Sequence, residues 1–130
     1  TVLLGKPNQE KIDTMKKTNE ALQAGIDLVK AGNTADDVAQ AFWKILDKYG
    51  IEKTSRTGYS IGIGYPPDWG EQTLNISKGD MTILEPNVTF HMIAVMQFGE
   101  WGVEASEAIR IIDGGCELFC DFPKDLHIKQ

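Results

Sequence analysis

The segment Gly58-Tyr-Ser-Ile-Gly-Ile-Gly-Tyr-Pro-Pro-Asp-Trp69 constrains the fold more than any other part of the chain. Apolar side chains alternate with Gly62 and Gly64, which predicts a short strand. Glycine inside a strand indicates that something approaches the backbone closely, either another chain segment, a ligand or a metal. Pro66-Pro67 then predicts a turn. We therefore expect this segment to form one wall of a pocket.

The composition excludes several classes of protein. With 130 residues, 42% of them apolar and 25% charged, the chain fits one globular domain or part of one. A net charge of −6 argues against a nucleic acid or an anionic membrane as partner, because either needs a basic patch. No apolar run approaches the roughly 18 residues of a membrane span. Without a signal peptide at Thr1, the expected location is the cytoplasm.

Two further features concern the cysteines and the start of the chain. Cys116 and Cys120 are predicted to be reduced, partly buried thiols, the alternatives being a disulfide or a metal site. The chain begins at Thr1 without a methionine and runs almost directly into a helix. We therefore expect residues 1–130 to be the later part of a longer polypeptide.

Two amphipathic helices open the chain. Apolar residues at helical spacing predict the first helix from Pro7 to about Ala31. Thr34 and Asp37 have the spacing of a capping box, so they predict the start of the second helix. That helix should end at Gly50.

After Gly50 the sequence favours strands. Apolar runs separated by turn signals predict extended segments at 58–65, 81–84, 88–96, 103–112 and 116–120. Residues 66–70 should form a surface loop, and the tail from Asp121 should be frayed. The prediction is an α+β fold, with two helices packed on one face of an antiparallel sheet.

Glu107 is the most unusual charge in the predicted sheet. It shares strand parity with Val103, Ala105, Ile109 and Ile111, so a carboxylate is set into an apolar face. Such a group needs a partner or a shifted pKa, and both are common at functional sites. The alternative is a structural salt bridge or hydrogen bond.

Four other residues are candidates for chemistry. His91 lies on an apolar strand, where it is either a functional group or a hydrogen-bonded core residue. Tyr59 either binds a ligand or packs at the start of a strand. Asp68 and Trp69 are candidate substrate-binding residues at the rim of a pocket. No group of Cys, His, Asp and Glu has the spacing of a complete metal site.

Four motifs in order resemble the creatinase/aminopeptidase family, whose catalytic domain is the pita-bread fold. These motifs are Val29-Lys-Ala-Gly-Asn-Thr-Ala-Asp-Asp-Val38, Gly58-Tyr-Ser-Ile-Gly62, Leu84-Glu-Pro-Asn-Val88 and the strand and glycine turn from Glu104 to Gly115. The resemblance spans nearly the whole chain. It implies that residues 1–130 are a single partial catalytic domain, the carboxy-terminal portion of a pita-bread domain.

Peptidases of that family bind two metal ions, but most of the ligand positions differ here. Tyr59 stands where the family has a histidine, and Ile93-Ala94 stand where it has Glu-Pro. The last acidic metal ligand of the family aligns with Ser106 if no gap is introduced. It aligns with Glu107 if the loop before Gly115 is one residue shorter. The resemblance therefore implies that no metal cofactor is used.

The phrase from Gly58 to Glu71, with Thr89-Phe-His91, resembles the ectoine hydrolase branch most. That resemblance implies a metal-independent C–N hydrolase of a small amidine-type substrate, with Tyr59, His91 and Glu107 as catalytic residues. The alternatives are an Xaa-Pro dipeptidase-like protein and a non-catalytic pita-bread binding module. Because strands of the sheet would be missing, we also expect this piece alone to be inactive and to form a homodimer across the open sheet edge.

Overall fold

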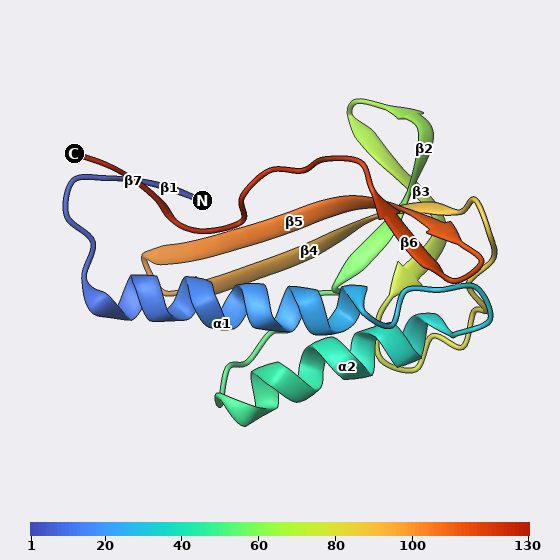
Figure 1. Cartoon of the computed structure of the whole chain (residues 1–130), viewed down its shortest axis with the longest axis horizontal. Helices are drawn as coiled ribbons and strands as arrows, with labels where there is room; N and C mark the ends of the chain where they lie inside the picture. Colours follow the sequence, from blue (N-terminus) through green and yellow to red (C-terminus); the bar gives the residue numbers. More distant parts are fainter.

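A five-stranded antiparallel sheet carries both helices on one face (Figure 1). The computed structural model describes residues 1–130. The elements in chain order are β1 (Val2–Leu4), α1 (Gln9–Ile26), α2 (Ala35–Lys48), β2 (Gly58–Tyr65), β3 (Asp68–Ile76), β4 (Thr89–Phe98), β5 (Trp101–Ile112), β6 (Gly115–Leu118) and β7 (His127–Lys129). The strand order in the large sheet is β3-β2-β4-β5-β6. The predicted α+β layout is confirmed.

Local capping explains where the helices begin and end. Asn8 accepts a hydrogen bond from the Lys11 backbone N–H at 3.0 Å, which caps α1. Thr34 and Asp37 form the predicted capping box of α2. Gly50, with a φ of +62°, lies just beyond α2 as predicted.

The first helix is shorter than predicted. The Asp27 N–H still bonds four residues back, to Gln23, but those of Leu28 and Val29 bond to carbonyls only three residues earlier, so the helix ends at Ile26. Those bonds tighten the last turn. The chain then reaches Gly32, whose φ of +90° does not allow the helix to continue.

The core lies between the helices and the sheet. On α2 the buried stripe is Val38, Phe42 and Leu46, and on β4 it is Phe90, Met92, Ala94 and Met96. α1 lies against β4 and β5, and α2 lies against β3 (Figure 1). Gly25 of α1 faces Met92, where an added Cβ would come within 2.7 Å of the Met92 Cε.

Three predictions of local structure are wrong. The surface loop predicted at 66–70 is mostly the start of β3, which pairs with β2 as a hairpin. Residues 81–84 are not a strand, since they make one isolated bridge, from Ile83 to Thr34, and so join the loop before α2. The tail is not frayed, because β7 pairs in parallel with β1.

The close backbone approach predicted for the glycine-rich segment is confirmed, and a neighbouring strand makes it. At Gly58, an added Cβ would lie 2.9 Å from the backbone oxygen of His91. Farther along, the Gly64 N–H donates to Glu71 Oε1 at 2.6 Å. Glycine therefore allows β2 to lie tightly against β4 and to bring residue 59 beside residue 91.

We predict that Gly58→Ala destabilises the fold by about 1–3 kcal/mol, because backbone atoms of β4 must move to admit the methyl group. The free energy of unfolding in urea measures this effect. Gly114→Ala is the matched control, since an added Cβ there meets nothing within 4 Å. Equal stability of the two variants would contradict the assignment.

Candidate functional site

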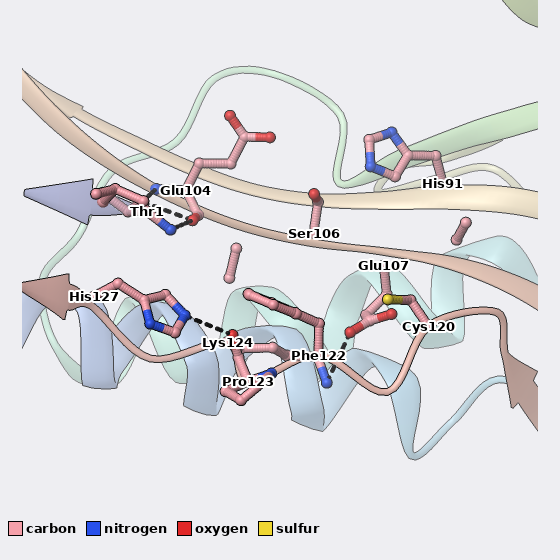
Figure 2. A pocket seen from close by; sticks show the side chains of 13 residues that line it. Thr1, His91, Glu104, Ser106, Glu107, Cys120, Phe122, Pro123, Lys124 and His127 are labelled. Atoms are coloured by element: carbon pink, nitrogen blue, oxygen red, sulfur yellow. Dashed lines mark hydrogen bonds and ion pairs between the residues drawn. The ribbon is translucent and has the colours of Figure 1, made fainter.

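The register of the sheet places a row of side chains, four of them polar, on the face that the helices leave uncovered. Tyr59 pairs with His91, Ile93 with Ser106, and Val95 with Glu104. Directly paired residues share a face, so these six side chains lie together. We call this side of the sheet the helix-free face. Figure 2 shows Glu104, Ser106 and His91 on one side of β4 and β5, with Glu107 on the other.

Tyr59 and His91 form the central contact of the helix-free face. The Tyr59 hydroxyl lies 3.1 Å from His91 Nδ1, and the two rings meet edge to face with centroids 5.5 Å apart. The Trp69 indole N–H donates to the same hydroxyl at 3.3 Å. Arg56 stacks over the Tyr59 ring at 4.6 Å. The structure thus brings together three of the five residues that the sequence predicted for the site.

The charge state of His91 follows from its surroundings. Burial lowers the pKa of His91 below its ordinary value of 6.5, although the carboxylates of Glu104 and Glu107 partly oppose this shift. His91 is therefore mainly neutral at pH 7. Since the Tyr59 oxygen accepts from Trp69, its own proton is available to Nδ1, which would leave the imidazole proton on Nε2. No protein group is bonded to Nε2.

A cavity of about 520 Å³ lies beside this row, between β5 and the carboxy-terminal tail (Figure 2). Its polar lining includes the following side chains: His91, Glu104, Ser106, Glu107, Cys120 and Lys124. Both predicted thiols are free, and Cys120 is exposed. The cavity gives a small molecule access to the edge of the helix-free face.

Glu107 lies on the opposite face of the sheet from Tyr59 and His91. It pairs with Met92 across the strands, only 5% of its surface is exposed, and its carboxylate is 2.8 Å from Lys124 Nζ. The family resemblance implied that Glu107 acts together with His91. Glu107 points to the other side of the sheet from His91, although both side chains line the same cavity of about 520 Å³. The partner that its burial required is Lys124, in the tail that was predicted to be frayed.

Asp68 and Trp69 begin β3 instead of forming a loop. The Asp68 carboxylate accepts from the Gly70 N–H at 2.9 Å and from the Gln72 side chain at 3.4 Å, so it organises the hairpin. Trp69 is 52% exposed beyond its bond to Tyr59. Trp69 therefore extends the Tyr59–His91 contact to the surface, whereas Asp68 bonds only within β3.

Three polar residues of this region were missed as site candidates. Glu104 and Ser106 were considered only as part of the acidic strand in the family resemblance. The alternation of side chains that singled out Glu107 also places Glu104 and Ser106 on the opposite face from Glu107, which is the face of His91. Lys53 is buried to 8% exposure in the segment before β2. No periodic pattern marks a lysine in an irregular segment, so its burial was not predictable.

The donor set of residues 1–130 does not complete a metal site. No group of three or more His, Cys, Asp or Glu side chains is arranged to hold an ion. The helix-free face offers one imidazole and one nearby carboxylate, together with a phenol and a hydroxyl.

None of the helices combines the length and the apolar composition needed to cross a membrane.

We predict that Lys124→Met destabilises the fold by about 2 kcal/mol, since it leaves the buried Glu107 carboxylate unpaired. This loss is smaller than that expected for a fully buried ion pair, because the Lys124 side chain is 26% exposed. Glu107→Gln in the same chain should restore part of the loss, as urea unfolding of single and double variants would measure. Lys48→Met, which breaks the exposed pair with Glu20, should change little. No loss in Lys124→Met would contradict a structural ion pair.

Comparison with curated proteins finds relatives along the whole chain. An ectoine hydrolase of Halomonas elongata is 42% identical over 130 residues, which are 99% of this chain and 33% of the relative. An uncharacterised hydrolase/peptidase of Sinorhizobium fredii is 35% identical over 130 residues, 100% of this chain and 33% of that protein. The chain thus spans about a third of the length of these relatives.

Solved structures show the same fold. An Xaa-Pro dipeptidase from Bacillus anthracis superposes with a TM-score of 0.90 at 21% identity, over 98% of this chain and 36% of the other. An identity this low carries the fold and nothing more. The predicted pita-bread architecture is confirmed.

A protein-family model described as metallopeptidase family M24 matches residues 1–114. This match corrects one prediction, since the expectation of no metal cofactor conflicts with membership of a metallopeptidase family. The ligands that such enzymes require are not completed within residues 1–130. Because the family model covers most of the sequence, the chain belongs to metallopeptidase family M24.

Proposed function

We propose that this chain is the carboxy-terminal part of the catalytic domain of a hydrolase that cleaves a C–N bond in a small amidine-type molecule. The observation that carries the proposal is the contact between Tyr59 and His91 on the helix-free face. The 42% identity to an ectoine hydrolase supports the choice of substrate class. The cavity beside His91 supports a small molecule as the substrate.

The chemistry follows from a neutral imidazole with one free nitrogen. Hydrolysis of an amidine adds the oxygen of water to the amidine carbon, breaks a C–N bond and transfers a proton to the leaving nitrogen. The Nε2–H of His91 can donate that proton to the leaving nitrogen while Nδ1 takes the proton of the Tyr59 hydroxyl. The attacking water returns a proton to the Tyr59 oxygen as its own oxygen bonds to the amidine carbon. Trp69 orients Tyr59 and, with its exposed edge, forms a wall for the substrate.

Further properties of the whole protein belong to the same proposal. We place it in the cytoplasm, with neither a nucleic acid nor a membrane as partner. We also propose a homodimer, since β3 is an outer strand of the large sheet and its edge away from β2 has no partner strand. That edge is open to a strand of a second copy. A monodisperse monomer in light scattering at high concentration would contradict the dimer.

We predict that His91→Ala lowers kcat for ectoine in the full-length protein by about 10²–10⁴-fold, as expected for loss of a group that transfers protons. Tyr59→Phe should lower it by a smaller factor, since the imidazole remains but loses its partner. The matched control is Tyr65→Phe, on the same strand but 84% exposed and without a hydroxyl contact. Steady-state kinetics check these values.

The same assay separates the two candidate substrates. Turnover of ectoine without turnover of an Xaa-Pro dipeptide is the expected result. Cleavage of the dipeptide alone would replace the proposal with the dipeptidase alternative. Full activity of both His91→Ala and Tyr59→Phe would remove these residues from the mechanism.

We also predict the pH dependence of the reaction. Because the pKa of His91 lies below 6.5, the neutral imidazole persists at pH 7. Activity should therefore fall only when the pH drops below 6.5 and His91 becomes protonated. Glu104→Gln removes a charge that favours imidazolium, so it should shift the acid limb of kcat/KM to lower pH. An unchanged acid limb in Glu104→Gln would contradict the influence of this carboxylate on His91.

A further inference from the structure

Lys53 is a buried ammonium group with an incomplete set of partners. It lies between α2 and β2, is only 8% exposed, and donates a short hydrogen bond to the Ser55 hydroxyl oxygen. That bond is its only hydrogen bond within the protein, and none of the three ion pairs includes it. An ammonium group has three N–H donors, so two of them have no protein acceptor.

A buried charge without a counter-charge is costly, which indicates that an anion belongs beside it. Burial lowers the pKa of Lys53, and the charge that opposes this shift is the carboxylate of Glu104, which forms no ion pair with Lys53. Ser55 adds a second donor, because its oxygen accepts from Lys53 and its own proton remains available. One ammonium and one hydroxyl are therefore available as donors in the same cavity.

The surroundings of Lys53 include space for a ligand. A cavity of about 300 Å³ is lined by Glu52, Lys53, Thr54, Ser55, Val95 and Gln97. Val95 and Gln97 have the strand parity of His91, so this cavity opens on the helix-free face. Glu52 is exposed, where solvent weakens its repulsion of an anion.

We propose that Lys53 and Ser55 form a subsite for the carboxylate group of a small-molecule ligand, on the same face of the sheet as Tyr59 and His91. His91 and Val95 are four residues apart on β4, about 13 Å along the strand. Identifying this ligand with the substrate rests on the proposed function, whereas carboxylate binding itself does not.

The test is a titration of the full chain with acetate, followed by NMR of the Lys53 side chain at constant ionic strength set with chloride. Acetate should cause a saturable shift of the Lys53 resonance and raise the pKa of Lys53, because the anion binds the protonated form. Ser55→Ala should weaken binding by about 10-fold, the effect of one lost hydrogen bond to a charged group. Lys53→Met should abolish the binding, as seen in the resonances of Ser55 and Gln97.

Lys30→Met is the matched control, since Lys30 is exposed and takes part in no ion pair. It should bind acetate like the unchanged protein. Absence of a saturable shift, or equal acetate binding by Lys53→Met, would overturn the subsite. Binding of inorganic phosphate but not acetate would overturn the carboxylate class. Acetate binding together with no turnover of ectoine by the full-length protein would refute the proposed function and leave the subsite standing.

Discussion

The antiparallel pairing of β4 with its two neighbours is the constraint on which the rest of the structure depends. It joins β4 to β5 from Thr89 to Phe98 and to β2 at Tyr59. Because strand side chains alternate, this register sends Phe90, Met92, Ala94 and Met96 under the helices and His91 to the other face. A shift of one residue would exchange the core with the candidate site.

Much of this arrangement could be predicted from the sequence, because periodic patterns report it directly. The capping box at Thr34, the buried stripe of α2 and the alternation in β4 and β5 all have short-range causes. The fold followed from these patterns and from the family resemblance, and only the resemblance assigned Tyr59 and His91 to one site. The strand Asp68–Ile76 did not, since its polar sequence lacks a clear alternation and its partner β2 decides its structure.

The errors in the site have a common physical reason. Glu107 was singled out because a carboxylate on an apolar face is unusual, but parity alone does not say which face is covered by helices. That information comes from the packing of α1 on the sheet and from the ion pair between Glu107 and Lys124, which are 17 positions apart in the sequence. Lys53 was missed for the same reason, since its burial arises from the folding of an irregular segment beside β4, with whose residues Val95 and Gln97 it lines one cavity.

Gly25 has a consequence for the position of His91 along the sheet. The helix can lie close to β4 only because a glycine faces the end of the Met92 side chain. If β4 slid by two residues, its faces would be preserved, but Phe90 or Ala94 would stand opposite Gly25. The phenylalanine is too large for that space and the alanine would leave it empty. The absence of a side chain at Gly25 thus favours the alignment of α1 and β4 in which Met92 faces the glycine. That alignment also fixes the position of His91 along the sheet.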